Sequence, residues 1–295
     1  MTSTTPIFGA RTGGTLVPVG HRTVLVPLDG SELSEHALEP ARWLAAHLGA
    51  TVHTVIVGFV DDARWYAQYV RSLQHRWPQL VPHFVGDLDV AWGIADLART
   101  LPDCLVCIGT HGRSRTAALL GSTFSEVARS RPEPLVAIGP RAAVPRQDAR
   151  RVVACVDGTA TSEQILPLAG GWARRLDATL DIVAVVEPLP PLPTHGEHHR
   201  PGPFADPMAY VTDLARRPVL AGMDIEAHLA FDPLGPEQGL IDHLADHPAT
   251  LVATTSQQRM HLDRALHGST ASRIIHASPV PVLVQPAIRP TEGSN

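Results

Sequence analysis

Glycine, serine and threonine gather at two neighbouring points in the first half of the chain, in a pattern suited to binding phosphate. Gly109 and Gly112 follow a short apolar run, and Gly121, Ser122 and Thr123 come after eight further residues, at the start of a predicted helix. Glycine allows a backbone to approach a ligand closely, and the first turn of a helix presents unpaired N–H groups to an anion. The pattern predicts a phosphate cradle at the carboxyl ends of buried strands; the alternative is that the glycines only form turns.

Cysteine and histidine offer two further candidates. Cys104 and Cys107 have CxxC spacing, but they lie in a predicted strand, where residues three apart point to opposite faces. We therefore interpret them, and Cys155, as buried structural cysteines. The cluster His195, His198 and His199 could bind zinc or nickel, and a solvated loop rich in proline and histidine is the favoured alternative. His36, His47, His53, His75 and His83 are scattered through predicted helices and strands without metal-ligand spacing, and no metal site is predicted for them.

Catalytic motifs are missing from the sequence. It contains no GxSxG nucleophile elbow, no HExxH zinc motif and no lysine-bearing P-loop. No catalytic residue is predicted, and hydrolysis of a phosphate-bearing ligand is expected to be slow at most, because positioning a phosphate assists its transfer even without a catalytic base.

The elements that must position these residues come from an internal repeat. A shift of 128 residues, without a gap, places Asp29 on Asp157 and Ser34 on Ser162. In each copy an apolar run ends at Asp-Gly, a segment with helical spacing follows, and a second apolar run comes next. Ser34 is expected to cap its helix. Apolar runs on both sides of a helix are typical of a parallel sheet that is buried on two faces.

Strands and helices are predicted to alternate through both halves. In the first half, strands are expected at 24–28, 52–59, 81–85, 105–108 and 135–138, and helices at 34–48, 64–77, 90–100 and 122–129. In the second half, strands are expected at 152–156, 180–186, 225–230, 251–253 and 280–284, and helices at 162–176, 208–216, 237–245 and 269–276. This alternation predicts an α/β fold.

Length and composition support two folded domains. The chain has 295 residues, of which 44% are hydrophobic and 18% charged, and such a composition is ordinary for a folded protein. The predicted organisation is a loose tail at 1–20, a first domain at 21–140, a linker at 141–150, a second domain at 151–286 and a tail at 287–295. A segment rich in proline and histidine at 188–207 is expected to be an inserted loop.

Charge, hydropathy and cysteine content exclude several classes of function. The formal net charge of −5 makes binding to nucleic acid or to an anionic membrane a poor prospect. The sequence has no apolar run long enough to span a membrane, and its N-terminus lacks the features of a secretory signal. Three cysteines cannot build a disulfide framework, and a cytoplasmic location is expected.

The motifs and the repeat together resemble the universal stress protein family, with two such domains in one chain. The resemblance rests on Asp29, on Val57 and on the glycines of the phosphate motif, and it covers about residues 23–138 and 151–284. It implies two tandem open parallel five-stranded sheets of order 3-2-1-4-5, flanked by helices on both faces, in the adenine nucleotide alpha hydrolase-like fold. It also implies pairing through the fifth strand, either in a homodimer or between the two domains of one chain.

The resemblance further implies that an adenine nucleotide is bound by residues at matching positions. In the first half these are Pro27, Leu28, Asp29, Val57 and Ile108 around adenine and ribose, Gly109, His111 and Gly112 along ribose and phosphates, and Gly121, Ser122 and Thr123 as donors to phosphates. In the second half they are Asp157, Val185, Gly268, Ser269 and Thr270. Arg113 could neutralise phosphate charge, or it could be an ordinary solvated arginine.

The sequence departs from the family motif in both halves. The family has nine residues between its second and third glycines, whereas eight residues separate Gly112 from Gly121 here. In the second half, Thr255 and Gln258 stand where the first half has Gly109 and Gly112, and their side chains would crowd the approach that glycine permits. We therefore expect a better nucleotide site in the first half and a weak or lost site in the second.

The expected function is that of a nucleotide-binding stress or regulatory protein. ATP, accompanied by Mg²⁺, is the expected ligand, with AMP or ADP as alternatives. Binding would order the phosphate loop and so alter a surface that contacts a partner. Two other functions stay open on the sequence: a stress-related scaffold that binds no nucleotide, and a slow ATPase.

Overall fold

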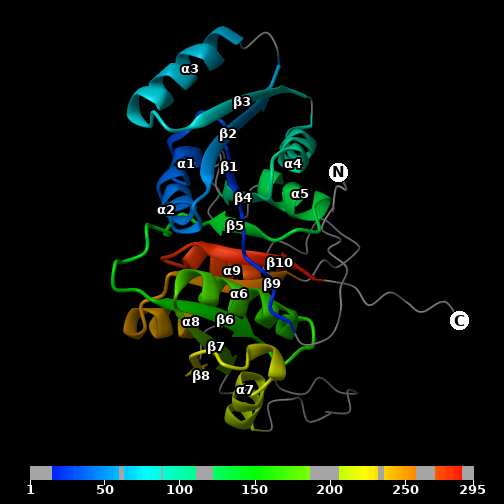
Figure 1. Ribbon diagram of the computed structural model, residues 1–295, viewed down its shortest axis with the longest axis vertical. Helices are drawn as coiled ribbons and strands as arrows, with labels where there is room; N and C mark the ends of the chain where they lie inside the picture. Colours follow the sequence, from blue (N-terminus) through cyan, green and yellow to red (C-terminus); the bar gives the residue numbers. More distant parts are fainter. Residues whose placement is uncertain are drawn as a thin grey trace, which may run out of the picture.

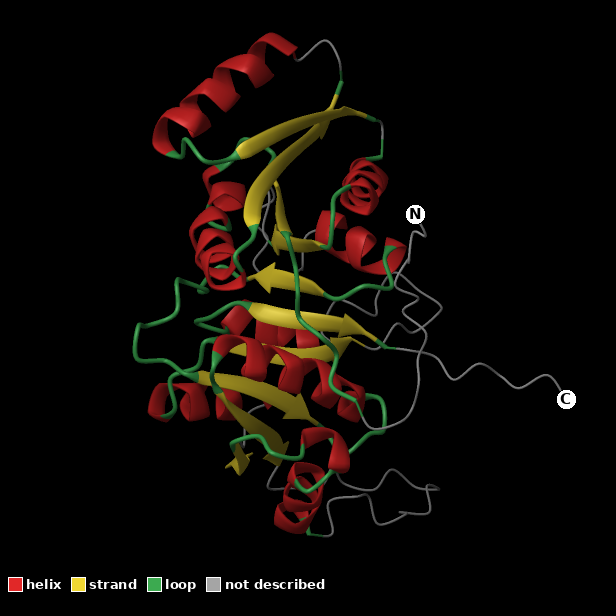
Figure 2. Ribbon diagram, viewed as in Figure 1, coloured by secondary structure: helices red, strands yellow, loops and turns green. Residues whose placement is uncertain are grey.

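A computed structural model describes residues 15–59, 63–87, 89–110, 122–186, 206–231, 236–256 and 270–287, and every structural statement below concerns these residues. One twisted sheet runs through the length of the molecule, and helices cover both of its faces (Figures 1 and 2). The α/β fold predicted from the sequence is confirmed. None of the helices in these ranges combines the length and the apolar character needed to cross a bilayer.

Strands and helices alternate in both halves. The first half contains β1 (Thr23–Pro27), α1 (Glu32–Glu35), α2 (Leu38–Leu48), β2 (Thr51–Gly58), α3 (Ala63–Arg76), β3 (Val81–Gly86), α4 (Val90–Thr100), β4 (Cys104–Gly109), α5 (Ser122–Ser130) and β5 (Leu135–Ile138). The second half contains β6 (Arg151–Val156), the 3₁₀ helix η2 (Ser162–Ile165), α6 (Leu166–Leu176), β7 (Thr179–Val186), α7 (Pro207–Ala215), the 3₁₀ helix η4 (Pro218–Leu220), β8 (Ile225–Phe231), α8 (Pro236–Asp246), β9 (Leu251–Ser256), α9 (Thr270–Ala277) and β10 (Val282–Pro286).

The two halves share one sheet of ten strands, in the order β3-β2-β1-β4-β5-β10-β9-β6-β7-β8. Each half therefore has the expected order 3-2-1-4-5, and the strands within each half are parallel. Where the halves meet, β5 and β10 run antiparallel, with Val136 opposite Leu283. Two five-stranded sheets are thus joined edge to edge at their last strands.

Alternation along the strands gives the sheet a separate apolar core on each face. In β1, Val24 and Val26 face one core and Leu25 faces the other, because successive side chains of a strand point in opposite directions. Side chains from α2, α3, α6 and α7 complete the first core. Side chains from α4, α5, α8 and α9 complete the second. Both cores include residues of both halves, so they continue across the β5–β10 junction.

The first helical segment is broken, although the sequence predicts one helix over 34–48. The structure has α1 first and then α2, which begins at Leu38. Pro40 lies in the first turn of α2, where its missing N–H costs nothing; deeper inside a helix its ring would clash with the preceding turn. The predicted cap is also wrong, because the helix begins earlier: the side chain of Ser31 accepts from the N–H of Ser34 at the start of α1.

The end of the segment predicted to be a loose N-terminal tail is packed. Figure 1 shows it in dark blue, crossing the second half beside α6. The N–H of Val17 donates to the carbonyl of Pro167 over 3.1 Å, and Val17 and Val19 pack against the core on this face. A Cβ atom on Gly171 of α6 would lie only 2.0 Å from the Val17 carbonyl oxygen, so this approach requires glycine. We call residues 15–20 the N-terminal strap.

Replacing Gly171 by alanine is expected to destabilise the complete chain and to stabilise a truncated one. In the complete chain the new methyl group displaces the strap, and over-packing of this kind costs about 1–3 kcal/mol. In a chain that lacks residues 1–20 the methyl group no longer meets its three nearest neighbours, because all three are atoms of Val17 and Val19. There alanine should gain about 1 kcal/mol through helix propensity.

The measurement is urea denaturation of four proteins, with and without residues 1–20 and with glycine or alanine at 171. The reversal of sign between the two backgrounds is the expected result. An equal effect of Gly171→Ala in both backgrounds would show that the strap does not rest on α6.

Candidate functional site

The turn after β1 fixes the carboxylate of Asp29. Its Oδ1 accepts from the backbone N–H and from the hydroxyl of Ser31, over 2.9 and 2.6 Å. The hydroxyl of Ser34 accepts from the N–H of Asp29 and donates to the carbonyl of Ser31. Gly30, between them, has a φ of +79°, a conformation that favours glycine. The network holds a charged oxygen acceptor at the carboxyl end of β1.

The second half repeats this turn. The Oδ1 of Asp157 accepts from the N–H and the hydroxyl of Thr159, over 3.1 and 2.6 Å. The hydroxyl of Ser162 accepts from the N–H of Asp157 and donates to the carbonyl of Thr159. Gly158 has a φ of +80°. The repeat recognised in the sequence thus extends to individual hydrogen bonds.

Neighbouring strands bring further predicted residues to the same edge of the sheet. The N–H of Leu28 donates to the carbonyl of Val55 over 2.8 Å, so β2 lies beside the chain up to the start of the turn. Gly109 ends β4 against α1: a Cβ atom at this position would lie 3.5 Å from the carbonyl oxygen of Leu33. The residues that this edge brings together are Pro27, Leu28, Asp29, Val57, Ile108 and Gly109.

Several predicted phosphate ligands lie outside the described residues. They are His111, Gly112, Arg113, Gly121, Gly268 and Ser269, and the histidines His195, His198 and His199 lie outside as well. Ser122 is the first residue of α5, with Thr123 next to it, and Thr270 is the first residue of α9. These three therefore lie in first helical turns.

Aromatic side chains that the sequence analysis missed cover the first turn. The indole of Trp65, on α3, lies so near Gly30 that a Cβ atom there would approach its Cζ2 to 2.5 Å. Trp65 stacks on Tyr69 with ring centroids 5.2 Å apart and planes 5° from parallel. Nearby, Arg76 forms an ion pair of 2.7 Å with Glu35. These contacts hold α3 over α1 and place aromatic surface beside Asp29.

The second half has a corresponding tyrosine, glutamate and arginine. The hydroxyl of Tyr210 donates to Glu163 over 3.0 Å, and Arg217 pairs with the other oxygen of Glu163 over 2.5 Å. Burial raises the pKa of Tyr210, and the neighbouring Glu163 raises it further. Six residues separate the tyrosine from the arginine in both halves, as Tyr69 and Arg76 show. This shared spacing is the sequence signal that could have revealed both clusters.

At the carboxyl ends of the strands in the second half, a threonine takes the place of Gly109. The hydroxyl of Thr255, near the end of β9, contacts the carbonyl of Ser162 over 3.5 Å. Asp157 and Val185 keep positions that correspond to Asp29 and Val57. Gln258 lies outside the described residues. The side chain of Thr255, which was predicted to crowd the approach of a ligand, therefore lies between β9 and η2.

A second polar cluster, also missed from the sequence, lies away from these edges. Asp181 of β7, His228 of β8 and His243 of α8 bring potential ligand atoms within 4.8 Å of one another. Asp181 is the third residue of β7, so it lies five residues before the carboxyl end of that strand. The available signal was the spacing of His243, on the predicted helix 237–245, and His247, four residues later and just beyond that helix.

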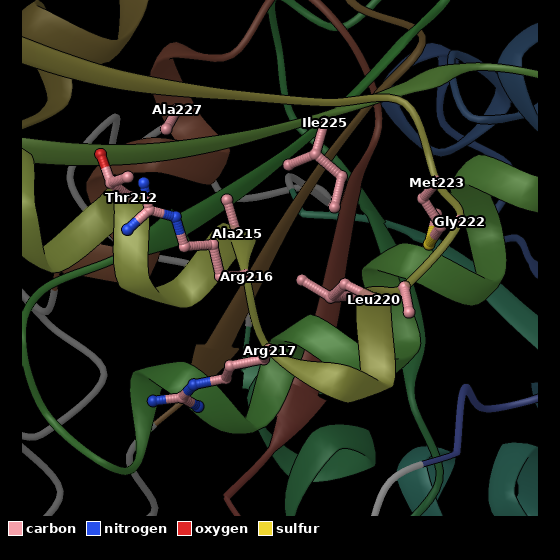
Figure 3. A pocket seen from close by; sticks show the side chains of 10 residues that line it. Thr212, Ala215, Arg216, Arg217, Leu220, Gly222, Met223, Ile225 and Ala227 are labelled. Carbon is pink, nitrogen blue, oxygen red and sulfur yellow. The ribbon is translucent and has the colours of Figure 1, made fainter.

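A surface hollow of about 450 Å³ lies among α7, η4 and β8 (Figure 3). Leu220, Met223 and Ile225 supply apolar lining. Of its two arginines, Arg217 is engaged with Glu163 and the other, Arg216, lies 3.8 Å from Asp213 as an exposed pair. The hollow offers no acid–base group among its lining residues, so we assign it no role.

The cysteines are free and largely buried, as predicted. Cys104 and Cys107, three residues apart on β4, contribute to opposite cores. Burial raises the pKa of Cys104 to about 11 and that of Cys155 to about 12, and it raises the pKa of Cys107 as well. A thiol is reactive only as a thiolate, so this CxxC pair has the properties of structural cysteines.

Comparisons with known proteins agree with this geometry. A model of the universal stress protein family matches residues 20–139 and 149–286. The structure of a universal stress protein from Archaeoglobus fulgidus DSM 4304 aligns with a TM-score of 0.61 and 18% identity, over 89% of this chain and 97% of that one. A functionally unknown protein from Pseudomonas aeruginosa PAO1 aligns with a TM-score of 0.59 and 16% identity, over 90% and 93%. These two likenesses establish the fold alone. No curated protein matches the sequence.

The raised thiol pKa values predict slow thiol chemistry in the folded chain. At pH 8 the native cysteines should react with a thiol reagent roughly a hundredfold more slowly than free cysteine, because so little thiolate is present. All three cysteines should react quickly in urea. Since the folded pKa of Cys104 is about 11 against an ordinary value of 9.0, its contribution to stability is complete below pH 9 and declines as the pH rises toward 11. A cysteine that reacts rapidly in the native protein at pH 8 would contradict this.

Proposed function

Because this chain belongs to the universal stress protein family, we propose that its first half binds an adenine nucleotide, with ATP as the preferred ligand. One observation carries the proposal: a carboxylate oxygen of Asp29 is fixed at the sheet edge formed by β1, β2 and β4, with Gly109 at the end of the adjoining strand. Ligands of open α/β sheets bind at this edge.

The residues present suit a nucleoside. The Asp29 carboxylate is held by two hydrogen bonds before any ligand arrives, so it can accept from ribose hydroxyls without being reorganised. Pro27, Leu28 and Ile108 supply apolar surface near it, and we assign the adenine to the space beside Val57. Trp65 adds a partly exposed aromatic wall beside the same turn.

We assign the phosphates to the segment between Gly109 and α5. Gly112, Gly121, Ser122 and Thr123 would supply backbone and hydroxyl donors, and the N-terminal end of α5 favours an anion. All 24 basic residues of this chain are arginines, so we assign the balance of phosphate charge to Arg113 and to Mg²⁺ bound with ATP. The proposal includes no general base, and we expect ATP turnover to be slow at most.

The second half is proposed to bind nucleotide weakly or not at all. Thr255 places its hydroxyl against the carbonyl of Ser162, where the first half has the hydrogen of Gly109. Asp157 is held in the same way as Asp29. The weaker nucleotide binding would therefore arise at Thr255 on β9 and not at the Asp157 turn.

We further propose that the protein acts in the cytoplasm as a regulator whose nucleotide occupancy changes a partner-binding surface. The β5–β10 contact supports a monomer, because it occupies within one chain the strand edge through which two chains of the family pair. Light scattering that gives the mass of two chains would contradict the monomer and leave nucleotide binding open.

A matched pair of substitutions tests the nucleotide site. Asp29→Ala and Asp157→Ala each remove a carboxylate that accepts the same two hydrogen bonds, so both should lower stability by a similar amount, about 1–2 kcal/mol. Only Asp29→Ala should weaken ATP binding, by about tenfold or more, because hydrogen bonds to a charged group are worth about 1.5–3 kcal/mol. Calorimetric titration with MgATP measures the affinity, and urea denaturation measures the stability.

The same titration gives the number of sites, and one tight nucleotide per chain is expected. Two equivalent tight sites would refute the proposed difference between the halves. The absence of adenine nucleotide in the supernatant of the denatured protein, together with no shift of the melting temperature on adding ATP, would favour a scaffold that does not use nucleotide.

A further inference from the structure

Four polar side chains converge on one face of the sheet in the second half. The Oδ2 of Asp181 lies 3.5 Å from the Nε2 of His243 and 3.8 Å from the Nε2 of His228. The ring of His247 stacks on that of His243, with centroids 4.4 Å apart. Asp181, His228 and His243 come from β7, β8 and α8, and His247 follows directly after α8.

Two atoms of this cluster are buried without a hydrogen bond. Asp181 is fully buried and the side chain of His243 is 6% exposed, yet within the described part of the chain neither the Oδ2 of Asp181 nor the Nε2 of His243 has a hydrogen-bond partner. Leaving a buried polar group unsatisfied is unfavourable, and more so when the group is charged. The Oδ2 of Asp181 and the Nε2 of His243 face each other across 3.5 Å, a separation at which both atoms could contact one bound ion.

In the first half, the positions that correspond to Asp181, His228 and His243 hold residues that need no bound ion. The repeat sets His53 at the position of Asp181 and His83 at the position of His228. The Nδ1 of His53 lies 2.8 Å from the Nε2 of His83, so these two rings satisfy each other directly. The position of His243 is held by Leu97, which packs against the core.

An arginine holds the carboxylate of Asp181 in the way that is common for metal-binding carboxylates. Arg151 donates to the Oδ1 of Asp181 over 2.8 Å and to Glu226 over 2.7 Å. The guanidinium thereby orients the Asp181 carboxylate, and the other oxygen, Oδ2, is the one that faces the imidazoles. Ligating carboxylates are commonly held in this way by an outer hydrogen bond.

We propose that Asp181, His228 and His243 bind a divalent transition-metal ion, with zinc as the best fit. Oxygen and nitrogen ligands lie about 2.0–2.2 Å from zinc, so neighbouring ligands of a tetrahedral ion are roughly 3.3–3.5 Å apart. The observed 3.5 Å between Asp181 and His243 falls in this range, and the 3.8 Å between Asp181 and His228 is slightly longer. Two imidazoles and one carboxylate form a ligand set typical of zinc, whereas magnesium and calcium prefer oxygen ligands.

The ion would act as a structural tie between β7, β8 and α8. The site lies five residues before the carboxyl end of β7, roughly 16 Å along the strand from the Asp157 edge, so it is separate from the proposed nucleotide sites. His228 is 22% exposed and offers a way in from solvent. Three protein ligands leave a fourth position for water or for His247 after a ring rotation.

Zinc content and zinc-dependent melting of the complete, tag-free chain test the proposal. The chain is stripped with a chelator, titrated with ZnSO₄ alone and assayed for metal by mass spectrometry. One zinc per chain is expected, with a rise in melting temperature. His243→Leu, which installs the residue of the first half, and His228→Ala, at the most exposed ligand, should each lower zinc affinity more than about a hundredfold. Cobalt bound in place of zinc should show the visible bands of a tetrahedral site.

Two controls identify where any zinc is bound. His83→Leu removes the histidine at the matching place in the first half and should leave zinc binding unchanged. Replacement of His195, His198 and His199 by alanine should also leave it unchanged. No zinc bound by the wild-type chain, or binding that survives both His243→Leu and His228→Ala, would overturn the proposal. If one of these variants does not fold, loss or retention of zinc in the other decides.

Discussion

The antiparallel contact between β5 and β10 is the constraint on which the rest of the structure depends. Both strands are short and almost wholly apolar, and in a separate domain each would be an edge strand with an unpaired row of backbone groups. Their pairing buries Val136 and Leu283 at the centre of one sheet. It also makes each apolar core continuous from the first half into the second.

The direction of this pairing fixes where chemistry can take place. Because β5 and β10 are antiparallel while all other pairs are parallel, the strands of the two halves run in opposite directions. The Asp29 turn and the Asp157 turn each lie at the carboxyl end of their own first strand. They are therefore on opposite sides of the shared sheet, along the direction of the strands. The two sites are free to differ in their ligands, and the change from Gly109 in the first half to Thr255 in the second shows that they have diverged.

Much of the fold could be predicted because the signals were local. The buried runs of β1, β5 and β7 and the periodic segments of α4 and α5 are explicit in the sequence, and these elements begin or end within a residue or so of the predicted positions. The broken first helix was missed because it depends on Pro40 in relation to a cap at Ser31, three residues before the predicted one. The strap was missed because Val17 packs on Gly171, more than 150 residues away.

The candidate sites were predictable to the same extent. Asp29 and Gly109 belong to motifs that can be read along one segment, and the structure sets them at one edge. Asp181, His228 and His243 belong to three segments with no motif in common. Their convergence follows from the register of β7 with β8, where His228 lies opposite Val183, two residues beyond Asp181, and from the face that α8 turns to the sheet.

By itself, the sequence determined the repeat, the alternation of strand and helix and the Asp-Gly turns, because each depends on neighbouring residues and on the periods of helix and strand. Three other features became visible only in the folded chain: two sheets become one, the strap rests on α6, and a carboxylate and two imidazoles face one another inside the second half. These features depend on contacts between distant segments, and the distance between two side chains is set by packing and strand register, which no single stretch of sequence contains.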